Sequence, residues 1–124
     1  MKIELLPTGA EECPLIRLFH FRRDEVEWLR QACRQLADGG PAIALHEQPW
    51  VESVGGCRLV LRAAADDVGV TVPPLTHDFV LTLSSEGWRE VKVKLRPFRS
   101  GTSGFNWLTD EGDVRVLFSQ SGQW

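Results

Sequence analysis

Residues 105–119 read FNWLTDEGDVRVLFS, and this stretch carries the strongest single signal for the fold. Two apolar segments flank a break rich in Asp and Gly, an arrangement typical of a β-hairpin. Phe105 and Trp107 fall on one face of the first strand, because alternate residues point the same way. The chain continues to Trp124, a large ring that is costly to leave in solvent. We therefore expect a C-terminal hairpin packed into the body of the protein, with Trp124 holding its end.

Upstream of the hairpin, residues 24–38 carry the pattern of a long amphipathic helix. Asp24 is placed to cap this helix, with Glu27 completing a capping box. Gly39 and Gly40 favour its termination, since glycine tolerates the left-handed conformation that ends many helices. The apolar stripe repeats at spacings of three and four residues and consists of Val26, Leu29, Cys33 and Leu36.

The segment from 85 to 98 fits two patterns. Trp88, Val91 and Leu95 fall at helical spacing, whereas Val91, Val93 and Leu95 alternate with cations at period two. Either Ser84 or Ser85 could cap a helix here, so we favour a second helix over about 85–96.

Several apolar runs elsewhere have the length and composition of strands, at residues 2–6, 15–21, 42–46, 58–63 and 79–83. Short connections between successive strands favour hairpins. The sequence therefore predicts a single α+β domain over residues 1–124. We expect one mainly antiparallel sheet, the long helix and the second helix packed on one of its faces, and the C-terminal hairpin.

Composition narrows the class of protein. The chain has 124 residues, enough for one domain with a substantial core. Its net charge of −3 is too small to indicate a nucleic-acid or membrane partner, and it has no apolar run long enough for a membrane span. Three widely spaced cysteines fit reduced thiols. We expect a cytoplasmic protein without nucleic-acid or membrane binding.

Cys57, His46 and His77 are the residues that could supply catalytic chemistry. Cys57 follows two glycines, which let a substrate approach the backbone, and either histidine could activate its thiol if the fold brought them together. No acid, base or oxyanion element accompanies Cys57 in the sequence, and the histidines do not stand at metal-ligand spacing. We therefore predict no catalytic residues, no cofactor and no metal site.

A basic segment suggests a different site. Residues 89–99 hold five cations against Glu90 alone, and the loop 100–104 consists of Gly, Ser and Thr. A basic face beside such a loop suits an anion, although the loop lacks the lysine and glycine spacing of nucleotide-binding motifs. The alternative hypothesis is therefore that the chain is a small-molecule or anion-binding domain. A degenerate enzyme that has kept its ligand site is one form of this alternative. Its predicted binding residues are Arg96, Arg99, Ser100 and Thr102.

Five tryptophans are many for a chain of this length. Tryptophan and other aromatic residues are enriched at protein interfaces and their binding hot spots. Trp50, in a loop after a proline, and Trp107, on the hairpin, are the predicted contact residues. The first function hypothesis is a small non-enzymatic interaction or accessory protein. It would act as a homodimer or on a protein partner, in a regulatory or immunity-type role.

Overall fold

The computed structural model describes residues 1–10, 13–72, 78–100, 104–109 and 113–124 and has an α+β fold. In chain order its helices, 3₁₀ turns (η) and strands are β1 (Lys2–Ala10), β2 (Cys13–Phe19), α1 (Arg23–Ala37), β3 (Ile43–Ala44), η1 (Leu45–Glu47), β4 (Glu52–Val54), β5 (Leu59–Ala63), β6 (Gly69–Thr71), β7 (Phe79–Leu83), α2 (Ser85–Leu95), η2 (Arg96–Ser100), β8 (Phe105–Thr109) and β9 (Arg115–Ser119).

The described strands form two mixed sheets. Sheet A has the order β4-β1-β2-β9-β8, and sheet B has the order β3-β5-β7-β6. The expected hairpin is confirmed, since β8 and β9 pair antiparallel. The expectation of a single, mainly antiparallel sheet is wrong, because β1–β4, β2–β9 and β5–β7 are parallel pairs. Parallel strands need a long crossover between them, so short connections in the sequence do not reveal them.

Helix α1 has 15 residues and begins one residue earlier than expected. Its N-cap is Arg22, whose backbone N–H donates to the Glu25 carboxylate at 2.8 Å. The expected capping by Asp24 with Glu27 is therefore displaced by two residues. Glu27 is left to contact other side chains.

The second helix is confirmed, and it spans Ser85–Leu95, 11 residues, which ends one residue earlier than expected. The Ser84 hydroxyl caps it by accepting the Gly87 N–H at 3.1 Å. Val93, which created the period-two pattern, is 67% exposed, so the alternation did not mark a buried strand face. In the described part of the chain, no helix is long and apolar enough to cross a membrane.

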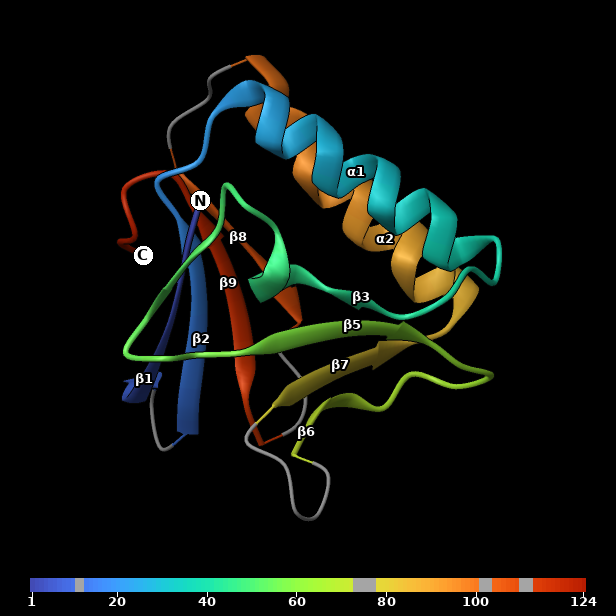
Figure 1. Ribbon diagram of the computed structural model, residues 1–124, viewed down its shortest axis with the longest axis horizontal. Helices are drawn as coiled ribbons and strands as arrows, with labels where there is room; N and C mark the ends of the chain where they lie inside the picture. Colours follow the sequence, from blue (N-terminus) through green and yellow to red (C-terminus); the bar gives the residue numbers. More distant parts are fainter. Residues whose placement is uncertain (11–12, 73–77, 101–103, 110–112) are drawn as a thin grey trace.

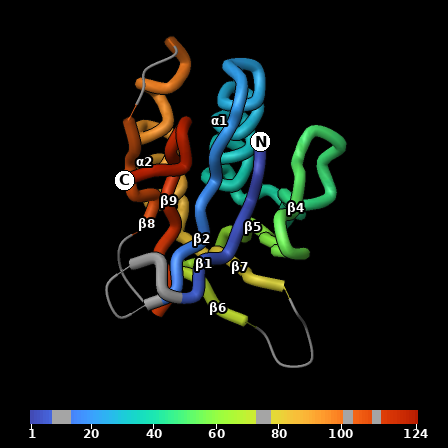
Figure 2. The backbone as a smooth tube through the Cα atoms, turned by 90° about the vertical axis from the view of Figure 1, so that its left-hand side faces the viewer, coloured from blue at the N-terminus to red at the C-terminus, as the bar shows by residue number. Residues whose placement is uncertain are grey.

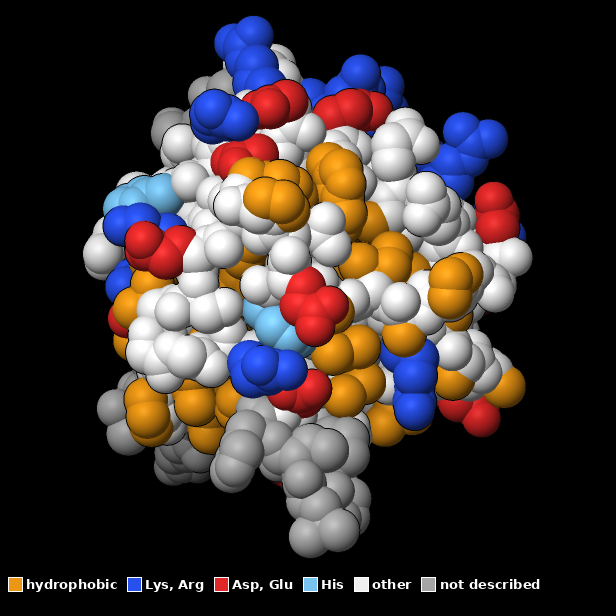
Figure 3. Space-filling view, viewed as in Figure 1, with side chains coloured by type: hydrophobic (Ala, Val, Ile, Leu, Met, Phe, Trp, Pro, Cys, Tyr) orange, Lys and Arg blue, Asp and Glu red, His pale blue; other side chains and the backbone are white. Residues whose placement is uncertain are grey.

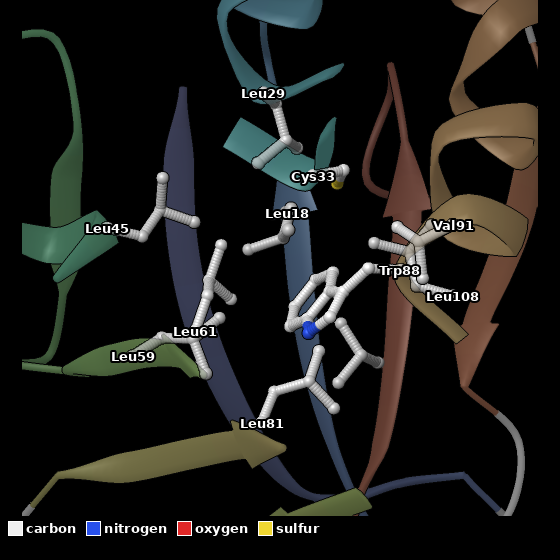
Figure 4. Close-up of a pocket in the computed structure, with 11 residues that line it drawn as sticks. Leu18, Leu29, Cys33, Leu45, Leu59, Leu61, Leu81, Trp88, Val91 and Leu108 are labelled. Atoms are coloured by element: carbon white, nitrogen blue, oxygen red, sulfur yellow. The ribbon is translucent and has the colours of Figure 1, made fainter. Parts of the chain in front are cut away.

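Sheet A, sheet B and the two helices enclose one hydrophobic core (Figure 1). Helices α1 and α2 lie side by side and run in opposite directions. At the centre, apolar side chains from both helices and both sheets surround a cavity of about 10 Å³ (Figure 4). Trp88 on its wall donates its indole N–H to the Arg62 carbonyl at 3.0 Å. An apolar space of this size is a packing gap rather than a ligand site.

Candidate functional site

Sheet A has one face on the core and one outward face (Figure 2). The pairing register assigns side chains to each face, because directly paired residues point the same way. Val116 pairs with buried Ile16 on the core side, whereas Trp107 pairs with Leu117 on the outward side. Among the described residues, no helix packs on the outward face.

The β8 side of this outward face carries the aromatic patch, which we define as Phe105, Trp107 and Arg115. Phe105 is 43% exposed, and its ring centroid lies 6.3 Å from that of Trp107 in an edge-on arrangement. The half-buried Trp107 packs over Leu15 and Leu117, and the Arg115 guanidinium carbon lies 5.9 Å from its ring centroid. Sequence reasoning selected Trp107 but missed Arg115, which the β8–β9 register brings beside it.

The residues after β9 cover a second part of the outward face. Arg17 donates to the Gly122 carbonyl at 2.9 Å and to Glu4 at 2.8 Å, and its guanidinium stacks 4.2 Å from the Phe19 ring centroid. Gly122 is buried, whereas Trp124 is 46% exposed. The C-terminal segment therefore packs on the body as expected, but Gly122 holds it there instead of the Trp124 ring.

Trp50 lies elsewhere. Its half-buried ring meets Trp28 of α1 edge-on, with the centroids 5.0 Å apart, and its carbonyl accepts a hydrogen bond from the Met1 backbone nitrogen at 3.0 Å. It lies two residues before β4, which is one edge strand of sheet A, whereas Trp107 lies on β8, the opposite edge strand. Trp50 and Trp107 therefore do not share one patch.

The candidate catalytic residues do not form a nucleophile site. Cys57 is buried, and burial together with the nearby Glu4 carboxylate raises the pKa of its thiol to about 11. His46 uses Nδ1 to accept the Leu59 backbone N–H at 3.0 Å. Within the described ranges, no hydrogen bond joins Cys57 to His46. His77 lies outside the described residues.

The described residues do not form a metal site. Across residues 1–10, 13–72, 78–100, 104–109 and 113–124, no group of three or more His, Cys, Asp or Glu side chains is arranged to hold a metal ion.

Three of the predicted anion-binding residues, Arg96, Arg99 and Ser100, belong to η2. Arg99 Nε lies 3.2 Å from the Glu27 carboxylate, which Arg30 also contacts at 3.2 Å. Ser100 offers its carbonyl to Arg23 at 3.5 Å. Arg96 is exposed, and Thr102 lies outside the described residues. The sequence did not indicate Arg23 or Arg30, because they belong to α1. The packing of the helices brings Arg23 to the Ser100 carbonyl of η2 and Arg30 to the Lys92 carbonyl of α2.

Glu27 is fixed as an anion by its neighbours. A hydrogen bond from Gln31 and the guanidinium groups of Arg30 and Arg99 hold the pKa of Glu27 below its usual value. Figure 3 shows Lys and Arg side chains, with Asp and Glu side chains beside them, at this upper end of the molecule, where α1 begins and α2 and η2 end.

A hollow of about 340 Å³ runs along the exposed side of α2. Its described lining contains two acidic residues, two basic residues and one apolar residue, namely Glu86, Glu90, Arg89, Lys94 and Val93. All of these residues come from one side of a single helix, so the basic segment 89–99 does not form one surface: Arg89 and Lys94 line this hollow, and Arg96 and Arg99 belong to η2. The hollow offers opposite charges side by side and selects for neither sign.

Comparison with known proteins gives no match to a family model, to a curated protein or to a solved structure.

Proposed function

We propose that this chain is a non-enzymatic interaction protein that binds a protein partner through the aromatic patch. The observation that supports the proposal is an outward sheet face on which Phe105, Trp107 and Arg115 lie together without a covering helix among the described residues. Aromatic residues and arginine supply a large part of the binding energy at protein interfaces. The partner is either a second copy of the chain or a different protein.

Two properties make the patch suited to binding. Trp107 is held from below by Leu15 and Leu117, both fully buried, so its ring is ordered before a partner arrives. Phe105 is the exposed residue of the aromatic patch, and its ring contacts the ring of Trp107. A partner that covers Phe105 removes apolar surface from water at little cost in side-chain order, since the neighbouring ring is already fixed.

Sedimentation equilibrium and pull-down from native lysate test the proposal with two variants. Phe105→Ser removes the exposed ring of the patch, and Val68→Ser removes a 54% exposed apolar side chain beside sheet B as a matched control. We expect Phe105→Ser to weaken self-association or partner capture by about tenfold or more, as hot-spot truncation does. Val68→Ser should leave both unchanged. The proposal would be overturned if the wild-type protein were strictly monomeric and if the wild type, Phe105→Ser and Val68→Ser all captured the same partners.

A further inference from the structure

Five arginines lie at the N-cap and in the first half of α1 and along η2, which packs against α1, and we call them the arginine end. They are Arg22, Arg23, Arg30, Arg96 and Arg99. Two carboxylates that reach the surface stand among them, those of Asp24 and Glu27, whereas the Glu25 carboxylate is buried and pairs with the Met1 nitrogen at 3.2 Å. The whole chain carries a net charge of −3, so the surface charge of this end is opposite in sign to the net charge of the rest of the molecule.

The internal ion pairs leave much of this charge unneutralised. Glu27 holds Arg30 and Arg99 through one carboxylate oxygen, at 3.2 Å each. Within the described residues, neither Arg23 nor Arg96 forms an ion pair. A guanidinium has five N–H donors, so even Arg99, with a half-exposed side chain, retains donors for a ligand.

Helix stability accounts for part of this arrangement and not for the rest. Asp24 at the start of α1, and Arg96 and Arg99 just after α2, lie where the helix dipoles favour them. Arg22 and Arg23 are the opposite case, because they place two cations at the positive end of α1. Both are exposed, and their contacts are at the surface: Arg22 pairs with Asp24 at 3.2 Å, and Arg23 donates to the Ser100 carbonyl at 3.5 Å. Surface contacts of this kind contribute little to stability.

We propose that the arginine end binds an acidic segment of a partner protein through its carboxylate or phosphate oxygens. These oxygens engage Arg23 and Arg96 and replace the Glu27 contact to Arg99. None of the five arginines lines the core cavity or the hollow along α2. The site is a surface of exposed side chains, which suits a multiply charged segment better than an enclosed small molecule.

Charge also favours a short acidic segment over nucleic acid. A long polyanion would extend from this end over the remaining, net negative surface and be repelled there. A short segment meets the cationic end alone. The site is independent of the aromatic patch, so the two proposals fail separately.

Fluorescence anisotropy at low salt tests the proposal with three probes of equal charge: a glutamate-rich peptide, a phosphoserine peptide and a single-stranded oligonucleotide. We expect salt-sensitive binding of at least one peptide, which identifies the oxyanion, and weaker binding of the oligonucleotide. Arg23→Gln with Arg99→Gln should weaken peptide binding about tenfold. Arg34→Gln with Arg62→Gln, two exposed arginines elsewhere, removes the same charge and should have little effect.

Two further variants separate the site from net charge and from folding. Glu27→Gln should tighten peptide binding about threefold, whereas Glu90→Gln, with the same change in charge, should not. Arg23→Gln alone should weaken binding without lowering the melting temperature, because that cation opposes the α1 dipole. Equal effects in each matched pair, tighter binding of the oligonucleotide, or no peptide binding at 20 mM salt would overturn the proposal.

Discussion

Gly122→Ala tests how the C-terminal segment closes on the body. Gly122 has φ +81°, and a Cβ there would lie 3.0 Å from Arg17 Nη1 and 3.1 Å from Phe19 Cδ2. The left-handed backbone costs a non-glycine residue about 1 kcal/mol, and crowding against a stacked Arg–Phe pair costs about 1–3 kcal/mol more. We expect a loss of about 2–4 kcal/mol in the free energy of unfolding, or roughly 8–15 °C in melting temperature.

Gly39→Ala is the matched control for this variant. Gly39 has φ +83°, and a Cβ there would meet nothing within 4 Å, so the backbone cost of about 1 kcal/mol acts alone. The difference between the two variants in urea unfolding isolates the packing of the C-terminal segment. Equal losses of unfolding free energy in the two variants would refute the claim that close packing at Gly122 holds the C-terminal segment on the body. Removal of the Trp124 side chain should cost less than Gly122→Ala, since that side chain is 46% exposed.

Three further predictions concern buried groups. Trp88→Phe should cost about 2–4 kcal/mol in urea unfolding, because it enlarges the core cavity and leaves the Arg62 carbonyl without its donor; a loss below 1 kcal/mol would contradict this. Glu25→Gln should cost about 2–4 kcal/mol, because both Glu25 oxygens lie 3.2 Å from the Met1 backbone nitrogen in a buried pair; thermal stability equal to wild type would contradict it. Cys57 should react with iodoacetamide at pH 8 about a hundredfold more slowly than a free thiol, because its pKa is raised to about 11. Mass spectrometry measures the labelling rate. A rate equal to that of a cysteine in a model peptide would contradict the prediction for Cys57.

The same thiol gives the sign of a pH dependence. Its pKa is higher in the folded chain than in the unfolded chain, so the folded state holds the proton more tightly. The stabilisation that accompanies this shift is present in full below about pH 9 and is lost as the pH rises toward 11. Unfolding of Cys57→Ala compared with wild type between pH 8 and 11 measures this contribution.

Local patterns predicted the elements of the fold better than their arrangement. The apolar stripe of Val26, Leu29 and Cys33 located α1 within one residue at each end, because helical periodicity is a property of neighbouring residues. The pairing of β2 with β9 joins residues 15–18 with 115–118 across nearly the whole chain. No short-range feature encodes that contact, so the two mixed sheets could not be foreseen.

The candidate surfaces follow the same rule. Trp107 was selected from its residue type and strand position, and both are visible in sequence. Arg115 joins it through strand register, and Arg23 approaches Ser100 through helix packing. Burial also decides the chemistry of Cys57. Its residue type and the two glycines before it suggested a reactive thiol, but burial raises the pKa of this thiol and favours its protonated form.

Site-specific photo-cross-linking measures the central claim, that the aromatic patch is a protein contact surface. A benzophenone analogue of phenylalanine in place of Phe105 conserves the aromatic ring, and the same analogue at Val68 serves as the control. The account predicts one dominant cross-linked product from position 105 in cells, containing either a second copy of the chain or one other protein, and none from position 68. No product at position 105, or the same products from both positions, would contradict it.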